Sequence, residues 1–150
     1  MSSAARSRSR SAARLAAVQA LYQQEMESTP VARLLKEFHD HRLGALIEDA
    51  QYVDAEREFF DDVVTGVAAR SAEIDAAISA RLADGWSLER LDRPMRAILR
   101  AGAYELLARA DVPVGSVISE YVDVAHAFYD KREAGFVNGL LDAVAKDVRG

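Results

Sequence analysis

The chain has no cysteine among its 150 residues. Disulfide bonds, thiolate metal sites and cysteine nucleophiles are therefore excluded. It also has no apolar run near the ~18 residues that a membrane-spanning helix needs. Both absences agree with a cytoplasmic protein, and we expect no contact with a membrane.

The short motifs of common active sites are missing as well. The sequence contains no G-x-S-x-G, H-E-x-x-H, G-x-x-x-x-G-K or G-x-G-x-x-G. Its many carboxylates have the spacing of solvated helix faces and caps. His39 and His41 are two residues apart, so on a helix they would point in different directions and form no metal pair. The sequence therefore predicts a binding protein rather than an enzyme, with no catalytic residue, metal or cofactor.

The charge is unevenly distributed along the chain. Residues 1–14 carry four arginines and no acid, a net charge of +4, whereas residues 15–150 carry 15 basic and 24 acidic side chains, a net charge of -9. A basic segment on an acidic body suggests that the segment meets an anion, and nucleic acid is the leading candidate. The acidic body would oppose indiscriminate binding to polyanions, so any such contact should be local.

Residues 1–9 are rich in serine, arginine and alanine, and we expect them to form a flexible basic arm. Arg6, Arg10 and Arg14 are four residues apart and would share one face wherever the following helix extends back that far. Two other interpretations stay open from composition alone. The same composition is typical of an organellar transit peptide, and many basic tails have no specific target.

Apolar residues recur with helical spacing in about seven segments, and no segment shows sustained two-residue alternation. The sequence therefore predicts an all-α fold. We expect Ser28 or Thr29, Asp54 and Ser71 to cap three of the helices. The expected helices cover about 10–27, 30–48, 54–70, 71–83, 91–107, 114–128 and 136–146.

The segment 91–107, LDRPMRAILRAGAYELL, organises the rest of the chain. It places Ile98 and Gly102 on an apolar face, where a glycine lets a neighbouring helix approach closely. Its basic edge consists of Arg93, Arg96 and Arg100. That edge is either a solvated face, with Asp92 and Glu105 nearby, or part of a binding surface.

Three smaller expectations concern packing. Pro94 suits the first turn of the central helix, because its missing N–H is a donor that would lack a partner there anyway. Gly139 should lie at a close helix contact. Trp86 and Leu88, in the connector before the central helix, should be packing residues rather than a platform for stacked bases.

Four blocks of sequence resemble the NusB family in the expected order. They are AAVQALYQ (16–23), LDRPMRAILRAGAYEL (91–106), DVPVGSVISE (111–120) and FVNGLLD (136–142). The resemblance spans nearly the whole chain from Arg10. It implies an all-helical NusB-like fold of two small packed subdomains, at about 10–70 and 71–150.

The resemblance also implies a function. NusB-like proteins are transcription antitermination factors that pair with NusE, a small-subunit ribosomal protein. The pair binds the single-stranded boxA element of nascent RNA and supports processive transcription of ribosomal RNA operons by the RNA polymerase antitermination complex. By this match the arm arginines (Arg6, Arg8, Arg10 and Arg14) contact RNA, and Arg100 is a further RNA contact.

The same match assigns an apolar set to the NusE-facing surface: Tyr22, Met26, Met95, Phe128 and Phe136. Met95 stands where the family pattern has an acidic residue. Two alternatives remain at this level. The chain could be a helical protein-interaction adaptor without RNA binding, or a fragment of a ribosomal RNA methyltransferase that carries a related helical module.

Overall fold

The computed structural model describes residues 3–41 and 53–150 of the chain, and it confirms the all-α fold. Within those residues there is no strand. Seven α-helices and one short 3-10 helix are present: α1 (Ser3–Glu27), α2 (Val31–His41), α4 (Val53–Ala69), α5 (Ser71–Ser79), η1 (Leu88–Arg90), α6 (Arg93–Ala108), α7 (Val114–His126) and α8 (Lys131–Arg149).

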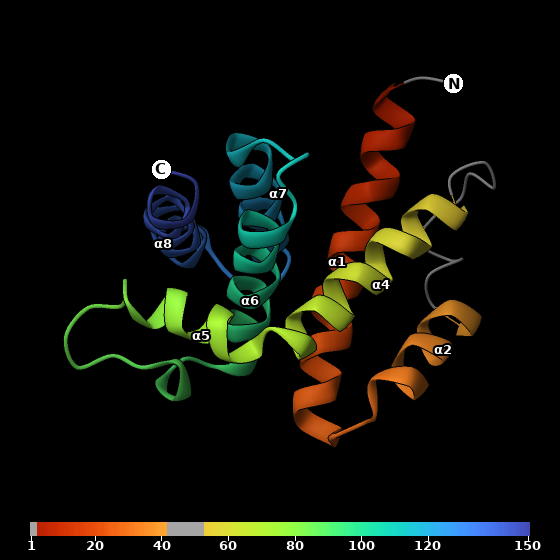
Figure 1. Cartoon of the computed structure of the whole chain (residues 1–150), viewed down its shortest axis with the longest axis horizontal. Coiled ribbons are helices and arrows are strands. Elements are labelled where there is room, and N and C mark those ends of the chain that lie inside the picture. The colour runs from red at the N-terminus through yellow and green to blue at the C-terminus, as the bar shows by residue number, and fades with distance from the viewer. Residues whose placement is uncertain (1–2, 42–52) are drawn as a thin grey trace.

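The helices form two groups around the long helix α1 (Figure 1). α2 and α4 pack against α1 on one side, and α5, α7 and α8 pack around α6 on the other. α6 also packs against α1 and α4, so the two groups share one hydrophobic core. The expected subdomain boundary near residue 70 falls between α4 and α5, and it stays a prediction.

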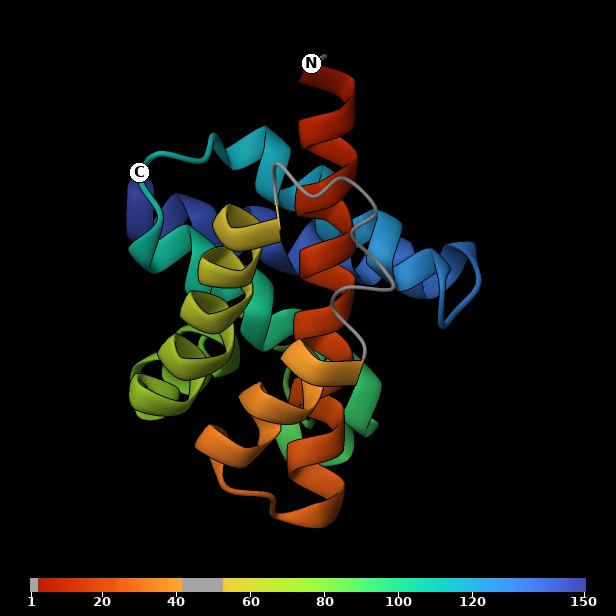
Figure 2. The ribbon, with the colours of Figure 1, turned by 90° about the vertical axis from the view of Figure 1, so that its right-hand side faces the viewer.

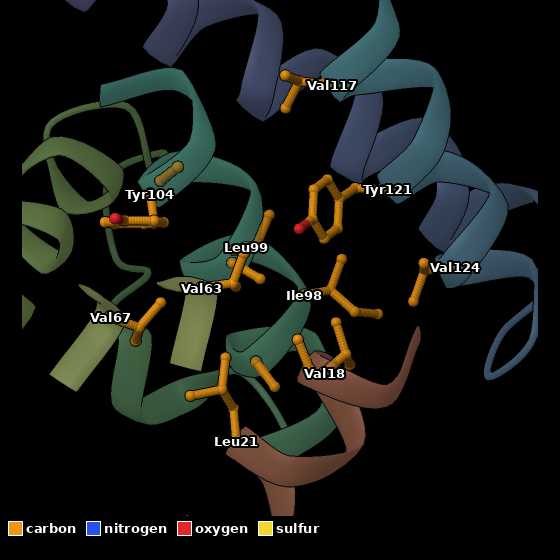
Figure 3. Packing of buried hydrophobic residues seen from close by; sticks show 14 of the residues in the cluster. Val18, Leu21, Val63, Val67, Ile98, Leu99, Tyr104, Val117, Tyr121 and Val124 are labelled. Carbon is orange, nitrogen blue, oxygen red and sulfur yellow. The ribbon is translucent and has the colours of Figure 1, made fainter. Parts of the chain in front are cut away.

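α6 supplies the centre of that core, as its apolar periodicity predicted. Figure 3 shows Ile98 and Leu99 between side chains of α1, α4 and α7. Both are fully buried. Gly102 has the close approach that we expected, because a Cβ atom there would lie 2.8 Å from Leu141 Cδ1 of α8. Gly139 does not, since nothing lies within 4 Å of the position of its Cβ atom.

Several helix boundaries differ from expectation. We expected α1 to begin near Arg10, but its helical backbone is continuous from Ser3, and its first turns extend past the neighbouring helices (Figure 2). Alanine and arginine have high helix propensity, which is compatible with this early start. Whether residues 1–9 move independently stays a prediction. The expected part of α2 beyond His41 lies outside the described residues.

None of the residues that we expected to cap a helix lies at the position directly before that helix. Pro94 lies in the first turn of α6, as predicted. However, α5 is capped by Arg70, and Ser71 is its first helical residue. Asp54 lies inside α4, which begins at Val53. Ser28 has a φ of 55°, so the helical conformation ends there, directly after α1. The carbonyl of Pro30 accepts the first hydrogen bond of α2, which the N–H of Leu34 donates.

A second close approach joins α4 to α6. At Gly66 of α4 a Cβ atom would overlap the ring of Tyr104, so only glycine lets that ring lie against the helix. The Tyr104 hydroxyl donates a hydrogen bond of 2.7 Å to Asp62 Oδ1. Burial of the phenol, followed by the hydrogen bond and charge of Asp62, raises the pKa of Tyr104 to about 12.

This raised pKa predicts a loss of stability in alkali. In the unfolded chain Tyr104 loses its proton near pH 10, whereas in the folded chain it keeps the proton until about pH 12. The unfolded state therefore binds fewer protons above pH 10, and the free energy of unfolding falls as the pH rises from 10 to 12. Urea unfolding across this range should show a shallower decline for Tyr104→Phe. Equal slopes in the two proteins would contradict the prediction.

Candidate functional site

The arginines at the start of α1 differ sharply in exposure. Arg8 is exposed, the side chain of Arg10 is 32% exposed, and Arg14 is only 3% exposed. The side chain of Arg6 lies outside the described part of the chain. Arg8 and Arg10 are therefore the described members of this group that solvent can reach.

Arg14 is held in a buried ion pair. Its Nε and Nη2 atoms donate to the two carboxylate oxygens of Glu105 on α6, at 2.8 and 3.0 Å. Its Nη1 atom lies 3.1 Å from Glu120 Oε1 on α7. The hydroxyl of Tyr121, also on α7, donates a short hydrogen bond to Glu105. Arg14 therefore ties α1 to α6 and α7.

The acidic partners keep Arg14 in its protonated form, and burial together with Glu105 keeps Tyr121 in its protonated form. Burial lowers the pKa of Arg14, but the hydrogen bond and charge of Glu105, together with Tyr121 and Glu120, raise it above its ordinary value overall. Burial, reinforced by Glu105, raises the pKa of Tyr121 well above its usual range. Although these acids occupy its donors, Arg14 lines the same hollow as Arg10, between α1 and the start of α7, and the RNA contact that we expected at Arg14 stays a prediction.

Arg10 has a more open environment. Its Nε atom donates to Glu56 Oε2 at 3.2 Å, and its guanidinium lies 4.4 Å from the centroid of the Phe59 ring. Glu56 and Phe59, both on α4, are 1% and 2% exposed. Arg10 thus rests on α4 through one hydrogen bond and one cation–π contact.

Three guanidinium groups surround Phe59: those of Arg10, Arg14 and Arg109. Arg109 also pairs with Asp62 and Asp111. Each of these cations therefore has at least one carboxylate partner, and the cluster holds no excess of positive charge. Affinity for a polyanion here depends on the geometry of the arginines more than on net charge.

Arg100 lies far from this cluster. It donates to Asp75 of α5 through Nε and Nη2, at 2.9 and 3.1 Å, and its Nη1 atom is 3.6 Å from Glu25. Glu25 is 15 residues after Arg10, which corresponds to about 22 Å along α1. The structure therefore does not join Arg100 and the arm arginines into one patch.

The rest of the expected basic edge is also paired or solvated. Arg96 donates to the carbonyls of Leu88 and Leu91 and pairs with Glu25. Arg93 is exposed. Of the acids that we expected nearby, Asp92 precedes α6, but Glu105 lies in the core with Arg14.

An apolar hollow of about 560 Å³ lies between the connector before α6 and the start of α8. Two of the expected partner-binding residues, Met95 and Phe136, line it. Met95 is 4% exposed and forms its floor, whereas Phe136 is 40% exposed at its edge. Tyr22, Met26 and Phe128 do not line this hollow, although Met26 and Phe128 are 50% and 38% exposed.

Trp86 is the residue of this hollow that the sequence analysis misassigned. We expected it to be buried in packing, but it is 56% exposed and lines the hollow. The Arg90 guanidinium lies 5.7 Å from its ring centroid. Leu88, by contrast, is buried as predicted. The prediction that Trp86 lies in the connector before the central helix was confirmed, but its exposure was not predicted.

The rim of the hollow carries both donors and acceptors. The hydroxyl of Tyr129 donates to Asp92 Oδ1 at 2.6 Å, and Arg132 also lines the hollow. Glu133 Oε2 is buried and has no hydrogen-bond partner among the described residues. A partner that fills the hollow with apolar atoms and brings an N–H donor would satisfy this oxygen.

The geometry offers surfaces for binding. Among the described residues, no group of three or more histidine, aspartate or glutamate side chains could hold a metal ion. His39 instead shares a hydrogen bond of 2.6 Å with Asp61. None of the described helices has the length and apolar character to cross a membrane. Fold and site define an all-helical binding protein with an arginine-bearing helix and a separate apolar hollow.

The chain belongs to the NusB family, whose model matches residues 11–146. It is 74% identical to the transcription antitermination protein NusB of Sphingopyxis alaskensis, covering 96% of this chain and 97% of that protein. It is 71% identical to the protein of the same name from Novosphingobium aromaticivorans, covering 95% of this chain and 96% of that protein.

Solved structures of the family have the same fold. A complex of the antitermination factors NusB and NusE with double-stranded RNA contains a chain that matches with a TM-score of 0.79 and 28% identity, covering 93% of this chain and 98% of that chain. NusB of T. maritima matches with a TM-score of 0.73 and 32% identity, covering 92% and 91% of the two chains.

Proposed function

We propose that this chain is a transcription antitermination factor that pairs with NusE and binds boxA RNA. In this role it acts in the cytoplasm, within the RNA polymerase antitermination complex, and supports processive transcription of ribosomal RNA operons. The observation that carries the proposal is the 74% identity, over nearly the full length of both chains, to a transcription antitermination protein. The fold shared with a NusB chain in a NusE–RNA complex supports it.

We assign RNA contact first to the projecting start of α1, through Arg6, Arg8 and Arg10. Arginines there neutralise phosphates and release counterions, so affinity should fall as salt rises. Bases of a single strand can also stack on guanidinium planes. Arg14 ties this segment to the core and, because it lines the same hollow as Arg10, remains a proposed RNA contact. Arg100 remains a proposed second contact, and RNA there would have to compete with Asp75 and Glu25.

We assign NusE to the surface around the hollow that is lined by Met95, Phe136 and Trp86. Its mixture of an apolar floor and charged rim is typical of a protein interface. Tyr22, Met26 and Phe128 extend the proposed surface. Because the body of the chain is acidic, a few arginines should bind RNA weakly alone, and a basic partner would raise the affinity by extending the RNA-binding surface.

The test is a titration of boxA-like single-stranded RNA with this protein, alone and with purified NusE. A scrambled strand and a double-stranded version of boxA serve as controls. We expect NusE to tighten binding to single-stranded boxA but not to the scrambled strand. We also expect the affinity of the ternary complex to decline with salt.

Two outcomes would contradict the proposal. If neither RNA nor NusE binds, the family match specifies the fold alone. If NusE binds but RNA binding is absent with and without residues 1–14, the chain is a protein-interaction adaptor.

A further inference from the structure

We propose that Glu56 and Phe59 are positioning residues that hold Arg10 in the orientation in which it binds RNA. This inference rests on the proposed RNA-binding function. It concerns α4, to which the family resemblance assigned no role in RNA recognition. Three observations carry the inference: the contacts of Arg10, the burial of Glu56 and Phe59, and the hollow beside Arg10.

The guanidinium of Arg10 is only partly used by the protein. Nε donates to Glu56, whereas Nη1 and Nη2 have no hydrogen-bond partner among the residues that the structure describes. With 32% of the side chain exposed, these two nitrogens are accessible from solvent. A guanidinium can bind a phosphate through two parallel N–H bonds, and the two terminal nitrogens supply such a pair.

Phe59 and Glu56 fix the plane of that guanidinium. The Phe59 ring supports one side at 4.4 Å, and Glu56 holds the Nε edge. Both supports are almost fully buried, so neither moves freely. An arginine side chain that is not held in this way loses rotamer entropy when it is immobilised by binding. Prior ordering removes part of that cost from binding.

The burial of the Glu56 carboxylate favours retention of its ion pair with Arg10. Its side chain is 2% exposed, and Arg10 is its one ion-pair partner in the described part of the chain. A buried carboxylate that lost its cation would be strongly destabilised. Arg10 is therefore expected to keep the bond to Glu56 when RNA binds, and to meet the phosphate with its terminal nitrogens.

Space for the phosphate lies beside Arg10. A hollow of about 510 Å³ between α1 and the start of α7 is lined by Arg10, Ser7 and Ser116. The acids Asp111 and Glu120 line it too. Each is already paired, Asp111 with Arg109 and Glu120 with Arg14. Arg14 lines the hollow as well and is paired with Glu105 and Glu120, so the hollow is close to neutral. The terminal nitrogens of Arg10 are the guanidinium donors left for an anion among the described lining residues.

Two neutral substitutions of similar length separate positioning from charge. Glu56→Gln removes the charge but keeps an oxygen that can accept from Nε, whereas Glu56→Met removes both. Measured by titration of boxA RNA in the presence of NusE, the Met variant is expected to bind about 3- to 10-fold more weakly than the Gln variant. The slope of log affinity against log salt should be the same for both, because the number of phosphate contacts is unchanged.

The decisive comparison repeats the Glu56→Gln and Glu56→Met substitutions in a protein that also carries Arg10→Ala. There the Gln and Met variants should bind equally, because the residue through which Glu56 acts is absent. Arg10→Ala itself should lower the salt slope by about 0.7. A purely structural role of Glu56 would instead leave the Gln–Met difference intact. Thermal unfolding establishes that each variant is folded, and Glu56→Leu replaces Glu56→Met if the latter is not.

The outcomes separate this inference from the function on which it rests. If Arg10→Ala weakens RNA binding but the Gln and Met variants bind equally, the positioning role is wrong and the RNA-binding role of Arg10 stands. If the Gln–Met difference persists without Arg10, Glu56 does not act through Arg10, and the inference is likewise wrong. If the unaltered protein with NusE does not bind boxA, the proposed function itself fails.

Discussion

Replacing Glu105 by alanine is expected to lower the free energy of unfolding by about 3–5 kcal/mol. Glu105 is fully buried and accepts two hydrogen bonds from Arg14 and one from Tyr121. Without it, a buried guanidinium loses its main counterion and a buried phenol loses its acceptor. Urea unfolding followed by circular dichroism measures the change.

Two further variants test the cause. The double variant Arg14→Met, Glu105→Leu removes both charges, so it should recover much of the lost stability, since apolar replacements of a buried pair are often neutral or stabilising. Glu73→Ala on α5 breaks an exposed pair with Arg70, the residue before that helix, and should change the stability little. A Glu105→Ala variant as stable as Glu73→Ala would show that the buried pair does not hold α1 in place.

The partner of Arg14 illustrates what the sequence could and could not predict. Helical periodicity correctly predicted the apolar face of α6, which contains Ile98 and Gly102. Glu105 follows those residues at i+7 and i+3, so the periodicity places it on the buried face, although we expected it near the solvated basic edge. The identity of its ion-pair partner, 91 residues away on α1, depends on how two helices pack, which local spacing does not specify.

The arginines of α1 and the position of Trp86 likewise depend on packing that local spacing does not specify. The four-residue spacing of Arg10 and Arg14 correctly indicated a shared helix face, since both guanidinium groups lie over the ring of Phe59. It did not indicate that one end of this face is exposed and the other lies in the core, so that Arg10 is partly exposed and Arg14 is buried. Trp86 was misassigned because its exposure is set by an irregular connector, where Gly85 has a φ of 85°. Neither propensity nor periodicity predicts such a path.

Phe136→Ala is expected to weaken NusE binding by on the order of 30-fold, corresponding to about 2 kcal/mol, the usual threshold for a dominant interface residue. Phe136 is 40% exposed and lines the hollow together with Met95 and Trp86. An exposed aromatic ring beside an unfilled apolar hollow gains most when a partner covers both. Isothermal titration calorimetry of NusE binding measures the loss.

A matched substitution on the same helix supplies the control. Asn138 is exposed on α8 and does not line the hollow, so Asn138→Ala should bind NusE like the unaltered chain. Trp86→Ala should weaken NusE binding as Phe136→Ala does, because both rings border the same hollow. Neither variant should change the weak binding of RNA to the protein alone, since Arg8, Arg10 and Arg14 do not line that hollow. Equal NusE affinity of the Phe136→Ala and Asn138→Ala variants would place the NusE surface elsewhere on the molecule.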